Sequence, residues 1–302
     1  MFLLTQFIGL VVLQANPLKI TAKINGTAQE VSNPYLGWID PPEPETKGEF
    51  ASIFSQILIA FVVAIVLLFL LMKFKIEIFL RFWFFAVVSL ALFLSFLAFI
   101  KIIPWFTLSI EKALIISAIL ALPLAFLKIF KRNILVHNFT ELLIYPGIAV
   151  VFVPLLNIYT IIALLILISV YDMWAVWKSG VMQKMAKYQI KKLRIFSGFF
   201  VPYLTKKQKQ KLKKLKMSKS PKKKAMKVSV AILGGGDIIF PIITAGVMLK
   251  TLGLLSAVFV ILGAALGLGY LFFLAKKKKF YPAMPFITAG IFIAMILSWI
   301  IL

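Results

Sequence analysis

Apolar runs of about 20 residues recur along the whole 302-residue chain. A helix needs about this length to cross the hydrocarbon core of a bilayer. Hydrophobic residues make up 62% of the chain and charged residues only 15%, a balance that excludes a soluble globular domain. A membrane β-barrel would instead show alternating segments of about ten residues. The sequence therefore predicts an all-α, polytopic membrane protein.

The apolar runs predict nine transmembrane helices. Their expected boundaries are 1–15, 51–72, 78–100, 104–127, 134–153, 155–177, 228–249, 252–275 and 280–302. The chain then has an N-terminal six-helix part (1–177), a connecting segment (178–227) and a C-terminal three-helix part (228–302). The first run is short, so it is either a retained helix or a signal peptide ending near Ala15. Because it lacks the basic residues that begin a signal peptide, we favour a retained helix.

The distribution of charge predicts the orientation in the membrane. Eighteen of the 34 Lys and Arg residues lie in 178–227, without an acidic residue among them. Basic residues gather in cytoplasmic loops, so we expect this segment to be cytoplasmic and to contact anionic lipid head groups. The net charge of +24 then follows from membrane topology, and we expect no nucleic-acid partner. Residues 16–50, which hold five of the ten acidic residues, are expected to form an extracytoplasmic loop. The pattern predicts a cell-membrane protein with a cytoplasmic N-terminus and an extracytoplasmic C-terminus.

Two aspartates lie inside these apolar runs. Asp172 ends the run from Ile161, and Asp237 follows three glycines. An ionisable group at membrane depth costs several kcal/mol unless it is paired or hydrated, so it marks a functional site by default. Counted from the nearest lysines at 1.5 Å per residue, both residues lie about 9 to 15 Å from the same cytoplasmic edge.

Two carboxyl groups that meet are the minimal equipment for aspartic hydrolysis, because they share one proton and titrate as a unit. One group takes a proton from water while the other protonates the scissile carbonyl.

The backbone near these acids is predicted to be irregular. Gly234–Gly236 are poor helix formers, and Pro241 removes the N–H that would bond to the carbonyl of Asp237. Pro282–Pro285 open the last run at the same edge of the bilayer. Such a backbone leaves N–H and C=O groups that an extended peptide segment can pair with as an added strand. Gly263 and Gly267, in contrast, are spaced for helix packing.

Three motifs resemble those of the GxGD intramembrane aspartyl protease family, which includes presenilin, signal peptide peptidase and archaeal homologues. Tyr171-Asp172 matches the YD motif, Gly234–Asp237 matches GxGD, and Pro282–Met284 matches PAL with methionine in place of leucine. The resemblance implies a presenilin-like fold of nine transmembrane helices and hydrolysis of peptide bonds within the transmembrane helices of membrane-protein substrates. It implies a catalytic dyad with surrounding active-site residues, and it implies no metal and no cofactor. Obligate partner subunits are not evident. The dyad would be Asp172 and Asp237, shaped by Tyr171, Gly234, Gly235, Gly236, Pro282, Ala283 and Met284.

One other class of function fits the buried acids. A secondary transporter or channel also uses broken helices and intramembrane acids as an ion or proton site. That alternative leaves the third motif without an explanation. A zinc protease is excluded because HExxH is absent, and the chain has a single histidine, His137, and no cysteine. The remaining acids of the apolar part, Glu111 and Glu141, are expected near helix ends, solvated or paired with basic and polar groups.

Overall fold

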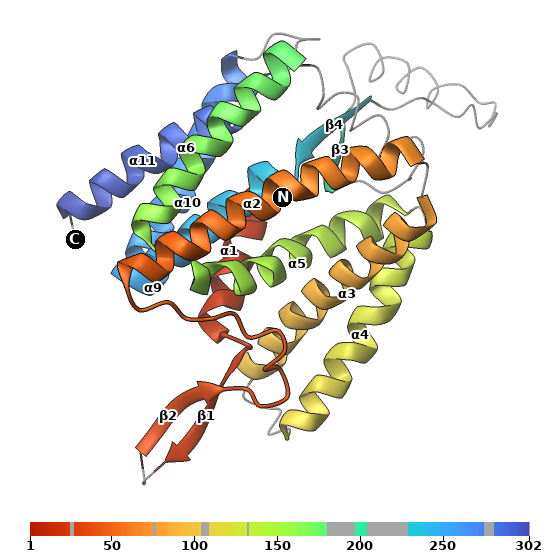
Figure 1. Cartoon of the computed structure of the whole chain (residues 1–302), viewed down its shortest axis with the longest axis vertical. Helices are drawn as coiled ribbons and strands as arrows, with labels where there is room; N and C mark the ends of the chain where they lie inside the picture. Colours follow the sequence, from red (N-terminus) through yellow and green to blue (C-terminus); the bar gives the residue numbers. More distant parts are fainter. Residues whose placement is uncertain are drawn as a thin grey trace, which may run out of the picture.

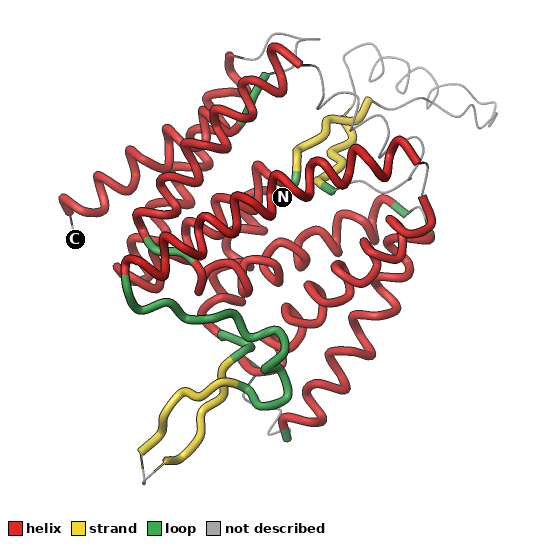
Figure 2. The backbone as a smooth tube through the Cα atoms, viewed as in Figure 1, coloured by secondary structure: helices red, strands yellow, loops and turns green. Residues whose placement is uncertain are grey.

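Helices dominate the computed structural model, which describes residues 1–24, 27–74, 77–103, 109–131, 133–179, 197–203, 229–274 and 281–301 (Figures 1 and 2). The helices are α1 (Phe2–Ala15), α2 (Lys47–Phe74), α3 (Glu77–Ile102), α4 (Ile110–Phe130), α5 (Ile134–Phe152), α6 (Ile158–Trp174), α9 (Gly236–Leu252), α10 (Leu254–Leu274) and α11 (Met284–Ile301). A short 3-10 turn, η1 (Val153–Leu155), follows α5, and a π-helical turn, η2 (Ala175–Ser179), extends α6. The strands form two antiparallel hairpins, β1 (Lys19–Ile24) with β2 (Thr27–Ser32) and β3 (Gly198–Tyr203) with β4 (Ser229–Gly234).

Seven of the helices in the described part of the chain are long and apolar enough to cross a membrane: α2, α3, α4, α5 with η1, α6 with η2, α10 and α11. The expected polytopic helical architecture is confirmed to this extent. The other two expected spans correspond to α1, with 14 residues, and α9, with 17. Their lengths are about 21 and 26 Å, against a hydrocarbon core of about 30 Å. The count of nine spans therefore stays a prediction.

The expected helix over 228–249 is wrong in its first third. Residues 229–234 form β4, which pairs with β3 so that Gly198 lies opposite Gly234. Three consecutive glycines stop a helix from extending back through this segment, and β3 supplies partners for its backbone groups. The helix α9 starts only at Gly236 and continues through Pro241. The irregular backbone thus precedes Asp237, whereas the sequence predicted irregularity around it.

The first helix, α1, is built into the core. It packs against α3, α5, α9 and α10, and Thr5, Gln6 and Val12 are almost completely buried. The side-chain amide of Gln6 donates a hydrogen bond to the carbonyl oxygen of Ile238, the residue after Asp237, at 3.0 Å. The helix α1 thus covers part of the core face of α9.

The extracytoplasmic loop expected over 16–50 contains the β1–β2 hairpin and the first turn of α2. Figure 1 shows this hairpin and the β3–β4 hairpin at opposite ends of the helices. The ammonium group of Lys19 lies 2.7 Å from the carboxylate of Glu43 and ties the following loop to β1. The hydrogen bond from Lys19 lowers the pKa of the Glu43 carboxyl below its ordinary value.

A central helix, α5, connects two packed groups of helices. It contacts α3 and α4 on one side and α1, α9 and the strand β3 on the other. Gly147 of α5 lies directly against the backbone of Ala91 in α3, where any side chain would collide with the carbonyl of Ala91. The close approach of α3 and α5 therefore requires glycine at this position.

Small residues also set the distance between α10 and α11. A Cβ atom at Gly263 would collide with the carbonyl oxygen of Gly290, and one at Gly267 would collide with that of Phe286. The prediction that Gly263 and Gly267 serve helix packing is confirmed. This contact sets the position of α11 in the fold, and with it the position of Met284, the first residue of that helix.

Of the two outcomes expected for Glu141, solvated or paired, the structure shows a buried pair. Its side chain is 1% exposed and forms an ion pair with Lys128 of α4, whose side chain is 4% exposed. A charge removed from water in this way needs an opposite charge beside it, which explains why Lys128 turns inward. Glu111, in contrast, is not buried and accepts a hydrogen bond from the hydroxyl of Tyr35 at 2.9 Å.

The packing of α10 and α11 predicts opposite effects for two glycines of the same helix. Gly267→Ala should lower stability by about 1–3 kcal/mol, because the new methyl group forces α11 away. Gly269→Ala is the matched control, since a Cβ atom at this position would have no atom within 4 Å. It should raise stability by up to about 1 kcal/mol through helix propensity. Thermal unfolding midpoints of the purified proteins test both, and equal effects of the two changes would contradict this packing.

The buried ion pair makes a second prediction. Lys128→Met leaves the Glu141 carboxylate buried without its partner and should lower stability by about 3–5 kcal/mol. The double change Lys128→Met with Glu141→Gln should restore most of that loss, because no unpaired charge remains. Lys131→Met, which removes an exposed lysine three residues away, is the control. Unfolding midpoints that do not separate the single from the double variant would show that the pair is solvated.

Candidate active site

Three helices that carry the three sequence motifs contact one another. Asp172 lies near the end of α6, Asp237 in the first turn of α9, and Met284 at the first position of α11. Each of the three helices packs against the other two. The fold therefore brings together motifs that lie far apart in the sequence, since Asp172 and Met284 are 112 positions apart.

The carboxyl group of Asp172 is held by the start of α11. The backbone N–H of Met284 donates a hydrogen bond to Oδ2 of Asp172 at 3.0 Å, and the backbone of Ala283 lies beside the same carboxyl group. The first N–H groups of a helix have no partner within the helix, and its amino end favours a negative charge. Asp172 provides both an acceptor for the N–H group and a carboxyl group at the amino end of α11, and it is only 8% exposed.

The carboxyl group of Asp237 lies against the end of β4. A Cβ atom at Gly234 would lie 3.1 Å from Oδ2 of Asp237, so the absence of a side chain there leaves room for the carboxyl group. Asp237 occupies the first turn of α9, where the helix dipole also favours a carboxylate. The carboxyl groups of Asp172 and Asp237 are close enough to act on each other electrostatically.

The three glycines before Asp237 are not equivalent. At Gly235, a Cβ atom would lie 2.7 Å from Oγ of Ser197 and 2.9 Å from the hydroxyl oxygen of Tyr145. At Gly236, the nearest atom would be 3.8 Å away, on the ring of Phe240. The packing thus favours glycine at Gly234 and Gly235, where a Cβ atom would press on neighbouring side chains, and leaves space at Gly236.

The remaining predicted site residues surround this pair of acids. Tyr171 contacts the ring of Phe61 in α2 edge-on, with ring centroids 5.8 Å apart. Pro282 and Met284 are buried and Ala283 is partly buried. Tyr171 therefore faces α2, whereas the Pro282–Met284 segment lies on the side of Asp172 that faces α11.

An apolar cavity of about 190 Å³ adjoins the site between α2, α5, α6 and α9. Its lining includes Phe61, Ile168 and Phe240. Ile168 lies one helical turn before Asp172, and Phe240 lies one turn after Asp237. The cavity therefore offers an apolar compartment next to the two acids. Among the described residues, no three His, Asp or Glu side chains are grouped as metal ligands.

Two parts of the site were missed by the interpretation of the sequence. One is β3, which lies in the segment 178–227 that was expected to be a loop; most of this segment falls outside the described residues. The signal was present, because Gly198–Tyr203 is an aromatic and β-branched run within a basic stretch. The other is the contribution of α1 and α5, whose Gln6 and Tyr145 reach the Asp237 turn.

Comparisons with known proteins agree with this geometry. A family model described as signal-peptide peptidase, presenilin aspartyl protease matches residues 41–302. Two solved structures, of a presenilin family intramembrane aspartate protease in the C222 and P2 space groups, match the fold. Their TM-scores are 0.61 and 0.60 and their identities 16% and 17%, over 100% of this chain and 97% and 96% of theirs. No curated protein matches the sequence. Because the family model covers most of the chain, this protein belongs to the signal-peptide peptidase and presenilin aspartyl protease family, and it is an intramembrane aspartic endopeptidase.

Proposed function

We propose that Asp172 and Asp237 form the catalytic dyad of this protease and that it hydrolyses peptide bonds within transmembrane helices of membrane-protein substrates. The observation that carries the proposal is the meeting of α6, α9 and α11, with Asp172 held by the Met284 N–H and within electrostatic reach of Asp237. The family match supports the reaction class, and nothing in the comparisons supports a transporter or channel.

The dyad chemistry uses one shared proton. The ionised carboxyl group takes a proton from a water molecule, whose oxygen attacks the scissile carbonyl carbon, while the protonated carboxyl group gives its proton to the carbonyl oxygen. The tetrahedral intermediate then collapses as its nitrogen receives a proton and the C–N bond breaks. A carboxylic acid and an amine leave, and the pair returns to its singly protonated state.

The substrate helix must unwind before attack, because its amides are hidden in i to i−4 hydrogen bonds. We infer that the unwound segment pairs with β4 as an added strand. In the described part of the chain β4 is paired on one side only, with β3, and it ends at Gly234, three positions before Asp237. A strand added to its other side would run past the dyad. The apolar cavity beside Phe61 and Phe240 is suited to an apolar side chain of that strand.

We also infer nine membrane spans, with α1 and α9 as the two short ones, in the cell membrane. The orientation rests on charge: the basic segment 178–227 leaves from η2 and returns through β4, so the dyad end of the protein faces the cytoplasm. The N-terminus is then cytoplasmic and the C-terminus extracytoplasmic. Anionic lipid head groups are the expected contacts of the basic segment.

Isosteric removal of either acid tests the dyad. Asp172→Asn and Asp237→Asn should each lower cleavage by at least about 1,000-fold, because acid–base catalysis alone contributes about 10²–10⁴-fold. Thermal stability should hold or rise, since a buried ionisable group is removed and the amide oxygen introduced by Asp172→Asn can still accept from the Met284 N–H. The assay is cleavage of a transmembrane peptide by the purified protein, with products identified by mass spectrometry.

The control for this experiment is Asp40→Asn, which changes the only other aspartate, in the loop between β2 and α2. It should leave cleavage unchanged. Turnover close to that of the parent protein in either Asp172→Asn or Asp237→Asn would remove that residue from the reaction.

The contact from α11 makes a separate prediction. Met284→Pro removes the N–H that binds Asp172, yet proline is well accepted at the first position of a helix. A hydrogen bond to a charged group is worth about 1.5–3 kcal/mol, so cleavage should fall about 10- to 100-fold. Met284→Leu keeps the N–H and should be tolerated, and Met284→Ala controls for the lost side chain. Equal activity of the Pro and Ala variants would show that the N–H has no role.

A further inference from the structure

The amino end of α5 holds the strand β3 by side-chain hydrogen bonds. The amide nitrogen of Asn138 donates to the carbonyl oxygen of Phe200 at 2.8 Å, and the N–H of Phe200 donates to Oδ1 of Asn138 at 3.1 Å. These are the two bonds that a residue of a neighbouring strand would exchange with Phe200. Asn138 therefore takes the place of a third strand at this point of the sheet.

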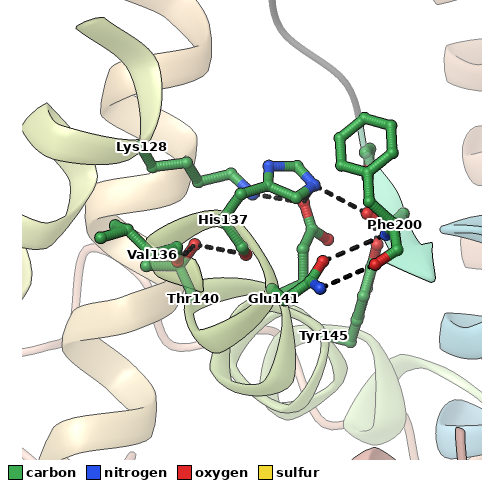
Figure 3. A network of polar contacts seen from close by, with 10 residues as sticks. Lys128, Val136, His137, Thr140, Glu141, Tyr145 and Phe200 are labelled. Carbon is green, nitrogen blue, oxygen red and sulfur yellow. Dashed lines mark hydrogen bonds and ion pairs between the residues drawn. The ribbon is translucent and has the colours of Figure 1, made fainter. Parts of the chain in front are cut away.

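The neighbouring residues of β3 also contact α5. The Nε2 atom of His137 lies 2.8 Å from the carbonyl oxygen of Gly198, and its ring packs on that of Phe200. Phe199, which is completely buried, packs edge-on against Tyr145. Figure 3 shows His137, Tyr145 and Phe200 gathered around this contact. Three successive residues of β3 are thus fixed to one helix.

The helix that holds β3 is itself fixed at this end. Glu141 forms its buried ion pair with Lys128 of α4, and its Oε1 atom lies 3.7 Å from Nε2 of His137 (Figure 3). Tyr145 lies one turn further along α5, and its hydroxyl oxygen is 3.4 Å from the hydroxyl oxygen of Ser197, the residue before β3. The side chains that contact β3 therefore belong to a part of α5 that is itself held by buried polar contacts.

A chain of contacts leads from β3 through β4 to the first turn of α9, which carries Asp237. Phe200 pairs with Ile232 and Gly198 with Gly234 across the hairpin. Gly234 lies against the carboxyl group of Asp237, and Gly235 fits against Tyr145 and Ser197. A two-stranded hairpin alone is marginally stable, so the position of Gly234 depends on what holds β3.

We propose that Asn138 is a positioning residue, which fixes the β3–β4 hairpin to α5 so that Asp237 and the free edge of β4 are in place before substrate arrives. The inference rests on the proposed function of Asp237. Asn138 also occupies the outer edge of β3, which directs an added substrate strand to β4. It acts through the hairpin and does not touch the reacting atoms.

The test compares two asparagines at the amino end of the same helix. Asn138→Leu keeps the number and branching of the side-chain heavy atoms and makes neither hydrogen bond to Phe200. The control is Asn133→Leu, which removes the side-chain cap at the start of α5; this cap accepts from the Leu135 N–H, a bond local to the helix. Asn138→Ser, which is smaller and polar, serves as a second variant if the Leu variant does not fold.

The first measurement is amide hydrogen exchange of 198–203 and 229–234 in the intact protein without substrate. Exchange should become about 10-fold faster in the Asn138 variants and stay unchanged in Asn133→Leu. Unchanged exchange in the Asn138 variants would overturn the proposal. Because no cleavage is needed, this result separates failure of the contact from failure of the proposed dyad.

The second measurement is cleavage of a transmembrane peptide, normalised to folded protein. The kcat should fall about 10-fold in the Asn138 variants, and the products should spread over neighbouring peptide bonds, because β4 no longer fixes the substrate relative to Asp237. A merely structural role would lower the folded fraction and leave the cleavage positions unchanged. Faster exchange with the parent kcat and cleavage positions would therefore overturn the positioning role.

Discussion

The hydrogen bond between the Met284 N–H and Asp172 is the contact on which the site depends. It joins α11 to α6 across 112 residues and satisfies two groups at once. The first N–H groups of α11 lack partners within the helix, and a carboxyl group in the interior needs a donor. The glycine contacts between α10 and α11 set the position of α11 and so bring its amino end to Asp172.

A second constraint governs the extended backbone near the site. Backbone N–H and C=O groups at membrane depth must find partners in the protein or in water. The β3–β4 hairpin meets this need on its inner edges by pairing, and at Phe200 by the side chain of Asn138. In the proposed mode of binding, an unwound substrate satisfies the outer edge of β4. The same requirement that makes extended backbone rare in membranes thus makes it suitable for binding a peptide that must also lose its helical bonds.

Much of the fold was predictable because transmembrane helices are encoded by local composition. The expected boundaries of 134–153 and 252–275 agree with α5 and α10 to within a few residues. The failures occurred where a partner decided the outcome. Residues 229–234 are apolar enough for a helix, but they form a strand, for which β3 supplies the hydrogen-bond partners. The partner of Glu141 was not predicted, because the approach of Lys128 from α4 cannot be seen in the local sequence.

The sequence by itself determined the class of protein, the two buried acids and the three motifs, because apolar length and the cost of intramembrane charge are local properties. Only the tertiary structure decided which groups meet. It put the Met284 N–H on Asp172, the Gln6 amide on the carbonyl beside Asp237, and Asn138 on β3. These contacts join residues that are 62 to 232 positions apart, and their formation depends on how the helices pack. Helix packing depends on shape complementarity at several glycines at once, which no single segment of the sequence specifies.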